Sequence, residues 1–286
     1  MENNLKFEPI YMEEYQAVLL EILRDIDRVC QKHNILYYMS GGTLIGAIRE
    51  KGFLAWDDDL DINMPRPDYE RFLRVADSEL DGKYKLLSSN DKKGNFFQYK
   101  KMSKVYDTTT FIEEGSPSFK VRYGIYVDIF AVDGTPNDEN LQDKHIKKIF
   151  RTREKDAFFA YQYDYNKGAK TFKGKLAYIT RSFMGKIYRT ILRRPYAKKL
   201  DKLLKKYDFY KSDMVGVLPW TKNHTGLFTR QAMEKAVKVE FAGEEFNAPI
   251  GYDENLTVAY GDYMTPPPKS EQVTHHNIVA YRIKEN

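Results

Sequence analysis

The sequence predicts an α/β (α+β) protein in which a small, mixed, twisted β-sheet is flanked by helices and carries a basic α-helical insert. Helical and strand-like hydrophobic patterns alternate along the first half of the chain, and Lys and Arg are concentrated in its middle. With 286 residues, the chain is long enough to bury a sizeable core. We expect three parts: a core over residues 1–137, the insert over 138–212 and a C-terminal part over 213–286.

Hydrophobic spacing alone predicts several elements of the core. Residues Met12–Gln31 carry apolar side chains at helical intervals, and Pro67–Leu80 form a second helix that a proline opens. A short apolar strand over Ile35–Met39 precedes a glycine turn, and a further helix starts at Thr43. Several short strands are expected between residues 84 and 112.

An acidic run is the most unusual feature of the chain, because four Asp residues occupy the five positions 57–61. The pattern of residues 55–64 is typical of a half-buried strand, on which Asp59 and Asp61 project from the same face. Side chains so placed lie about 6.5–7 Å apart, so both carboxylates can touch one cation between them. Crowded carboxylates repel each other, and a hard divalent cation, Mg²⁺ or Mn²⁺, relieves that repulsion. The alternative is a solvated acidic turn.

The segment before the acidic run is suited to holding a phosphate. A turn joins a strand to the start of a helix, where backbone N–H groups and the helix dipole favour an anion. It consists of Ser40, Gly41, Gly42 and Thr43. Arg49, further along the helix, offers a guanidinium to a phosphate or to one of the aspartates, with a plain surface cation as the alternative. The chain lacks Rossmann and P-loop spacing at this position, which excludes those two motifs.

Two blocks of the sequence carry a resemblance to a known family. The first comprises Tyr38–Arg49, Gly52-Phe53, Trp56–Ile62, Met64–Arg66 and Asp68-Tyr69. The second comprises Pro249–Tyr252, Leu256, Tyr260–Met264, the prolines at 266–268 and His275-His276. Both blocks resemble motifs of the LicD family of phosphocholine transferases, which is similar to the wider nucleotidyltransferase superfamily. Agreement at two blocks almost two hundred residues apart is hard to obtain by chance.

The resemblance implies a nucleotidyltransferase-like catalytic core whose active site the C-terminal part completes. In that superfamily a glycine turn, two aspartates on one strand and a third carboxylate on a neighbouring strand hold two metal ions. Asp128 is the candidate for the third carboxylate, because it stands alone in the apolar run Tyr126–Phe130 and an isolated buried acid is costly unless paired or metal-bound. Asp133 is then either a turn residue or a partner in the outer shell of the metal site.

The resemblance also implies a reaction. A CDP-linked donor, usually CDP-choline, passes its phosphocholine group to a hydroxyl of a cell-surface glycan precursor, such as lipopolysaccharide or teichoic acid, and CMP is released. Lys104 resembles a lysine of the family that neutralises a phosphate, although a solvated strand lysine fits its position equally well. His275 and His276 follow a proline-rich loop, where they either reach the donor phosphate or acceptor or are ordinary loop histidines.

Composition indicates a cytoplasmic protein with possible peripheral attachment to the inner face of a membrane. The N-terminal residues carry charges and lack an apolar stretch, so no signal peptide is expected. No window approaches the roughly 18 apolar residues of a transmembrane helix. Cys30 has no partner in the chain, which fits a reducing compartment and excludes an intramolecular disulfide.

The insert is strongly basic although the whole chain has a net charge of only +5. Between Lys144 and Lys206 there are 20 Lys and Arg against four acidic residues. Five apolar residues follow helical spacing within a cationic surface: Leu176, Ile179, Phe183, Ile187 and Ile191. The pattern of 172–194 is typical of an interfacial helix that contacts an anionic membrane, or of a helix that packs on the core. We do not expect a nucleic-acid partner, because no recognised nucleic-acid module accompanies the basic residues.

Two other functions remain compatible with these features. A nucleotidyltransferase would use the same aspartates but attack a nucleoside triphosphate and release pyrophosphate. A noncatalytic glycan- or lipid-binding protein would retain its activity without Asp59 and Asp61. The residues do not choose among choline, glycerol and ribitol phosphates, because all three meet the same metals.

Overall fold

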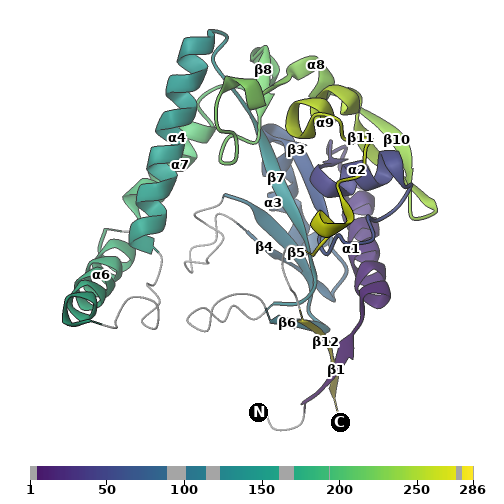
Figure 1. Cartoon of the computed structure of the whole chain (residues 1–286), viewed down its shortest axis with the longest axis horizontal. Coiled ribbons are helices and arrows are strands. Elements are labelled where there is room, and N and C mark those ends of the chain that lie inside the picture. The colour runs from purple at the N-terminus through teal and green to yellow at the C-terminus, as the bar shows by residue number, and fades with distance from the viewer. Residues whose placement is uncertain are drawn as a thin grey trace.

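A computed structural model describes residues 5–88, 101–113, 123–160, 171–192, 194–274 and 279–285. The fold is a mixed α/β structure, as expected, with helices packed around a curled β-sheet (Figure 1). The central path of this seven-stranded sheet has the order β2-β3-β7-β5-β4, and β8 and β9 extend it from β7. The strands are β2 (Tyr38–Met39), β3 (Asp61–Pro65), β4 (Tyr84–Leu87), β5 (Ser103–Asp107), β7 (Tyr126–Gly134), β8 (Met214–Gly216) and β9 (Phe228–Thr229).

The central strand β7 organises the sheet. It pairs in parallel with β3 and antiparallel with β5, while β2 and β4 add antiparallel strands outside these two. Parallel and antiparallel pairs thus meet at β7, which makes the sheet mixed as the sequence predicted. Its nine residues Tyr126–Gly134 are nearly all buried, as expected of a strand covered on both faces.

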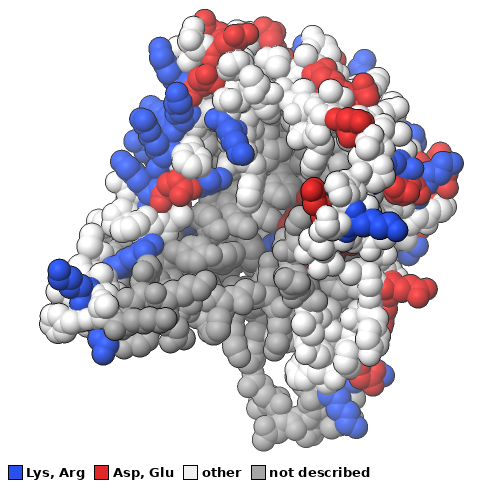
Figure 2. All heavy atoms as spheres, in the orientation of Figure 1, with Lys and Arg blue, Asp and Glu red and all other residues white. Residues whose placement is uncertain are grey.

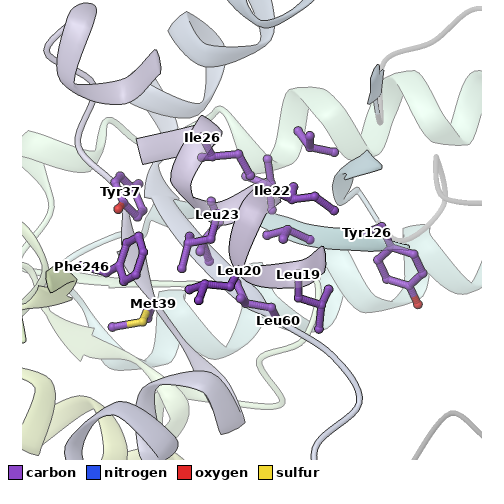
Figure 3. Close-up of a cluster of buried hydrophobic side chains, with 14 of the residues drawn as sticks. Leu19, Leu20, Ile22, Leu23, Ile26, Tyr37, Met39, Leu60, Tyr126 and Phe246 are labelled. Atoms are coloured by element: carbon purple, nitrogen blue, oxygen red, sulfur yellow. The ribbon is translucent and has the colours of Figure 1, made fainter. Parts of the chain in front are cut away.

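Three helices flank the sheet: α1 (Met12–Lys32), α2 (Gly41–Arg49) and α3 (Arg66–Glu79). Apolar residues of α1 recur at helical spacing and are buried. Figure 3 shows Leu19, Ile22, Leu23 and Ile26 of α1 in the same cluster as Tyr37, Met39 and Leu60. This core holds the start of β3, and therefore the acidic run, in a fixed position.

Two smaller sheets connect the chain ends and the C-terminal part to this core. The first has the order β1-β12-β6 and joins β1 (Leu5–Ile10) and β6 (Thr110–Glu113) to β12 (Val279–Glu285). The second is a hairpin of β10 (Ala236–Phe241) and β11 (Glu244–Pro249). Helices α8 (Arg230–Met233) and α9 (Tyr252–Tyr260) flank this hairpin in sequence, and α9 packs beside α2. Short 3-10 turns lie at Phe209–Lys211, His224–Gly226 and Lys269–Glu271.

The basic insert is a separate layer of helices at the left of Figure 1. It contains α4 (Glu139–Ala160), α6 (Phe172–Thr190) and α7 (Pro195–Leu204). Helices α4 and α7 share a small apolar core formed by Ile146, Ile149, Leu200, Leu203 and Leu204. No helix in the described residues combines the length and apolarity needed to cross a membrane.

The structure corrects three details of the sequence prediction. The strand expected over residues 55–64 begins only at Asp61, because the chain turns before it and the amide of Asp57 donates to the carbonyl of Leu54. The strand expected over Ile35–Met39 is reduced to β2. Asp133 is not in a turn: it lies in β7, fully buried, where it accepts two hydrogen bonds from the guanidinium of Arg66 (2.6 and 2.9 Å).

Candidate active site

Two of the expected acids face each other in the central sheet. Asp61 is the first residue of β3, and Asp128 is its register partner on the parallel strand β7. Neighbouring strands lie about 4.8 Å apart, and register partners on them project from the same face. The amide of Asp128 donates to the carbonyl of Leu60 (2.9 Å), which fixes this register next to the acidic run.

The N-terminus of α2 is tied to the same point of β3. The hydroxyl of Thr43 accepts from the amide of Asp61 (3.0 Å), and the amide of Ser40 donates to the carbonyl of Asp61 (3.0 Å). Ser40 and Thr43 therefore hold the helix start against the strand. These two bonds join the helix to the strand, so the anion site that the sequence predicted here depends mainly on Gly41 and Gly42.

Both glycines lie in direct contact with the aspartates. Gly41 has a positive φ of 59°, which favours glycine, and a Cβ on it would lie 3.1 Å from Oδ2 of Asp61. A Cβ on Gly42 would lie only 2.4 Å from Oδ2 of Asp57. The absence of side chains at these positions thus lets the carboxylates approach the backbone at the start of α2.

The acidic run is electrostatically crowded. Burial, together with the charge of Asp59 and a hydrogen bond with it, raises the pKa of Asp57 to about 8. Burial, Asp59 and Asp128 raise the pKa of Asp61 well above its usual range, and Lys104 only partly opposes this. Neighbouring carboxylates share one small space, so this arrangement favours a bound cation or a shared proton.

Lys104 is buried beside the third acid, and its role in neutralising a phosphate stays a prediction. Its ammonium nitrogen lies 2.6 Å from Oδ1 of Asp128, and both side chains are buried. The nitrogen also lies 3.3 Å from the ring centroid of Tyr126. The solvated strand lysine that the sequence left open is therefore wrong, and Lys104 is a buried counterion of the third acid.

A cavity of about 540 Å³ opens above the acidic run. One wall comes from α2 and the acidic run, and includes Gly42, Arg49, Trp56, Asp57, Asp59 and Asp61. The opposite wall comes from the end of α9 and the segment after it, and includes Tyr260, Asp262, Tyr263, Thr265 and Pro267. Its volume is in the range of small-molecule sites, which span about 300–1,000 Å³. Burial and the nearby aspartates raise the pKa of Tyr260 to about 12, so its hydroxyl stays protonated.

Arg49 lines this cavity, and its hydrogen bonds go to Glu50 and Tyr263. Its Nε donates to Glu50 (2.8 Å), its Nη1 donates to the carbonyl of Tyr263 (3.0 Å), and the guanidinium lies 5.9 Å from the ring centroid of Trp56. The remaining nitrogen, Nη2, is buried without a hydrogen-bond partner in the described structure. A donor group of this kind in a cavity wall is suited to an anionic ligand.

The described residues do not contain a ready-made metal site, since no three acidic, histidine or cysteine side chains among them are arranged to hold one ion. Asp59 and Asp61 supply the oxygen ligands that Mg²⁺ prefers, and their mutual repulsion fits a cation. Asp128 is close to them but already paired with Lys104. His275 and His276 lie outside the described residues.

The sequence prediction missed several cavity residues. Asp57, Trp56, Tyr260, Asp262 and Tyr263 all belong to the motifs on which the family resemblance rested, but they were not expected in the site. The signal that could have found them is the second motif block, whose aromatic and acidic residues form the wall opposite the acidic run.

Comparison with known proteins agrees with this geometry. Residues 34–165 match the family model described as LicD/FKTN/FKRP, nucleotidyltransferase domain. The chain is also 32% identical over 281 residues to the lipopolysaccharide cholinephosphotransferase LicD of Haemophilus influenzae, which covers 94% of this chain and 97% of that protein. The chain belongs to the LicD family. Uncharacterized proteins of Rickettsia typhi and Rickettsia prowazekii match shorter stretches, at 37% identity over 63 residues and 40% over 50 residues.

The two comparisons cover different parts of the LicD-type site. The family model includes the turn at 40–43, the acidic run and Asp128, but ends before the wall formed by α9. The Haemophilus relative aligns over nearly the whole chain, so both walls of the cavity fall within the shared length. The Haemophilus relative, as a cholinephosphotransferase, is a transferase of phosphorus-containing groups.

Proposed function

We propose that this LicD-family chain transfers phosphocholine from CDP-choline to a hydroxyl of a cell-surface glycan precursor and releases CMP. One observation carries the proposal: a cavity lined by Asp57, Asp59 and Asp61 opens beside the N-terminus of α2 in a chain related over nearly its full length to a lipopolysaccharide cholinephosphotransferase. In the reaction, the acceptor oxygen forms a bond to the donor phosphorus and the phosphorus–oxygen bond to CMP breaks. The proton of the acceptor hydroxyl passes to a carboxylate of the site or to water.

The proposed cofactor is Mg²⁺ or Mn²⁺, with two ions as in related nucleotidyltransferases. Asp59 and Asp61 are the proposed ligands, with Asp128 as a third once its oxygen is freed from Lys104. The ions would neutralise the donor diphosphate and the charge that develops on departing CMP. The support from this chain is that burial and the crowding of carboxylates raise the pKa of Asp61 and of Asp57.

The protein's own groups would hold the donor in place. We propose that amides at the start of α2 and the free nitrogen of Arg49 bind its phosphates. The aromatic residues Trp56, Tyr260 and Tyr263 line the same cavity, and aromatic rings are the usual surface for a quaternary ammonium group. The lack of a Cβ on Gly42 lets the carboxylate of Asp57 approach the start of α2. His275 and His276 stay candidates for a donor or acceptor contact.

The acceptor is proposed to be a glycan or a lipid-linked glycan, which the enzyme meets at the cytoplasmic face of the membrane. No nucleic acid takes part in the proposed reaction.

The test is a product analysis with the purified full chain. CDP-choline, CDP-glycerol, CDP-ribitol, CTP and ATP are each incubated with Mg²⁺ or Mn²⁺ and a glycan acceptor, and the products are identified by mass spectrometry. We expect CMP and a phosphocholine-bearing acceptor from CDP-choline, and neither product with EDTA or with the Asp61→Asn variant. Pyrophosphate from a nucleoside triphosphate, without turnover of any CDP-linked donor, would instead identify a nucleotidyltransferase.

A further inference from the structure

Helix α6 presents two opposite faces of different chemistry. Six apolar side chains on α6 and just after it are between 55% and 83% exposed: Phe172, Leu176, Ile179, Phe183, Ile191 and Leu192. Phe172, Leu176, Ile179 and Phe183 follow helical spacing and form one stripe along α6, and Ile191 and Leu192 lie just beyond its end. An exposed stripe of this size is uncommon on a monomeric soluble protein and marks an interaction surface.

The opposite face of α6 fixes the helix on α4. The guanidinium of Arg181 donates to the carbonyl of Phe158 (3.1 Å), and the ring of Tyr188 stacks on Phe159 with centroids 5.2 Å apart. The hydroxyl of Tyr188 donates to Asp156 (2.7 Å). Because these contacts hold one side of α6 against α4, the apolar stripe points away from the rest of the insert.

A buried ion pair strengthens this anchor. Asp156 is completely buried and also accepts from Nη2 of Arg194 (2.5 Å), a residue just beyond the end of α6. Breaking a buried pair of this kind is strongly unfavourable. The orientation of the stripe therefore does not depend on the stripe's own contacts.

Positive charge surrounds the apolar stripe. Lys173, Lys175 and Lys186 lie on the flanks of α6, and no acidic residue occurs between Tyr165 and Leu200. Figure 2 shows Lys and Arg gathered along α4 and α7, with further blue groups among the uncharged surface over α6. An apolar stripe bordered by cations matches a bilayer surface, where acyl chains lie beneath anionic headgroups.

We propose that α6 lies in the interfacial layer of an anionic lipid bilayer, with its stripe among the acyl chains and its lysines at the headgroups. A second copy of the chain fits this surface less well, because pairing two stripes would bring two sets of lysines together. Nucleic acid offers no apolar groove for isoleucine and phenylalanine side chains. The inference rests on the proposed function in one respect: docking of this kind would bring the active site to a lipid-linked acceptor.

The test measures vesicle binding by flotation with the full chain, using phosphatidylcholine vesicles with or without phosphatidylglycerol. We expect binding to the anionic vesicles at least tenfold stronger than to neutral ones, and weaker binding as salt increases. The variant Leu176→Asp/Phe183→Asp should lose binding at least tenfold, and Lys175→Glu/Lys186→Glu should lose the preference for anionic lipid. Leu141→Asp is the matched control, because Leu141 is 49% exposed on another helix of the insert and its variant should bind like wild type.

Circular dichroism of each variant verifies that it is folded. The inference is wrong if the wild type does not bind anionic vesicles, if the stripe variant binds as well as the control, or if light scattering shows a dimer that the stripe variant dissociates. CMP release from CDP-choline with a water-soluble acceptor is measured in parallel and should be unchanged in all these variants. Vesicle binding without CMP release contradicts the proposed function alone, and CMP release without vesicle binding contradicts only this inference.

Discussion

Lys104 and Asp128 face each other across the antiparallel pair of β5 and β7, with 2.6 Å between Nζ and Oδ1. Both residues are buried, so the attraction between their charges is weakly screened. The pair does not isolate Asp128 from the acidic run, because Asp128 still raises the pKa of Asp61 and Lys104 only partly opposes this effect.

Replacement of Lys104 should destabilise the folded protein. We expect Lys104→Met to lower the free energy of unfolding by about 3 kcal/mol, because it leaves the carboxylate of Asp128 buried without its counterion. Urea denaturation at neutral pH measures the change. In the double variant Lys104→Met/Asp128→Asn the loss should be clearly smaller than the sum of the two single losses. Additive losses would contradict a direct pair.

The fold was predictable where hydrophobic spacing is regular. The expected helix Met12–Gln31 agrees with α1 to within one residue, because its buried side chains keep a strict helical period. The strand expected over 55–64 was too long, because an alternating pattern cannot show that the backbone of Ala55 and Trp56 turns instead of pairing. Burial of Asp133 depends on Arg66, a partner 67 residues away that no local pattern reveals.

The site was predictable in its acids and less so in its walls. Asp61 and Asp128 do lie side by side, because one strand pairing brings them into register. The partnership of Lys104 with Asp128 depends on a second pairing, whose register a single sequence does not contain. The wall from Tyr260 to Pro267 depends on the packing of α9 beside α2, which is a long-range contact.

Gly42 offers a test of the acidic run that leaves every carboxylate in place. A Cβ there would lie 2.4 Å from Oδ2 of Asp57, so Gly42→Ala must displace this side chain toward the cavity. We expect kcat/KM for CDP-choline to fall at least tenfold while stability changes by less than about 1 kcal/mol, because only the end of a side chain has to move. Steady-state kinetics and thermal unfolding measure the two quantities.

Gly82→Ala is the matched control for this substitution. No atom lies within 4 Å of a Cβ at Gly82, and the residue is far in sequence from the cavity walls. Its kinetics should equal those of the wild type. A wild-type value of kcat/KM in the Gly42→Ala variant would show that the reaction does not need Asp57 at its observed position.

His145 should make the stability of the insert sensitive to acid. Burial and the nearby Lys206 lower the pKa of His145 to about 4, whereas an unfolded histidine titrates near 6.5. Between these values the unfolded chain binds more protons than the folded chain, so stability is complete at neutral pH and decreases as pH falls. The loss should be about 1–2 kcal/mol, reduced by partial solvation of the ring.

The variant His145→Gln isolates this contribution. It lacks the titrating ring, so its free energy of unfolding should decrease less between neutral pH and about pH 4.5 than that of the wild type. Urea denaturation at several pH values measures both slopes. Equal slopes would mean that the histidine is protonated as easily in the folded chain as in the unfolded one.

A substitution at Arg49 tests how the cavity recognises an anion. Its side chain is only 8% exposed, two of its nitrogens are used by Glu50 and Tyr263, and Nη2 has no hydrogen-bond partner in the described structure. Arg49→Lys keeps a positive charge but removes the planar fork, which costs about 1.5–3 kcal/mol for a charged hydrogen bond. We therefore expect KM for CDP-choline to rise at least tenfold with a smaller change in kcat, the signature of lost ground-state binding.

The control for Arg49 is a surface arginine that pairs with an acidic residue away from the cavity. Arg24 is 48% exposed and pairs with Glu244, so Arg24→Lys should leave KM unchanged. If Arg49→Lys instead lowers kcat and leaves KM at its wild-type value, the guanidinium acts on the transition state rather than on the bound donor. If neither constant changes, the free nitrogen does not face the donor phosphates, and the anion site lies at the glycines of α2 alone.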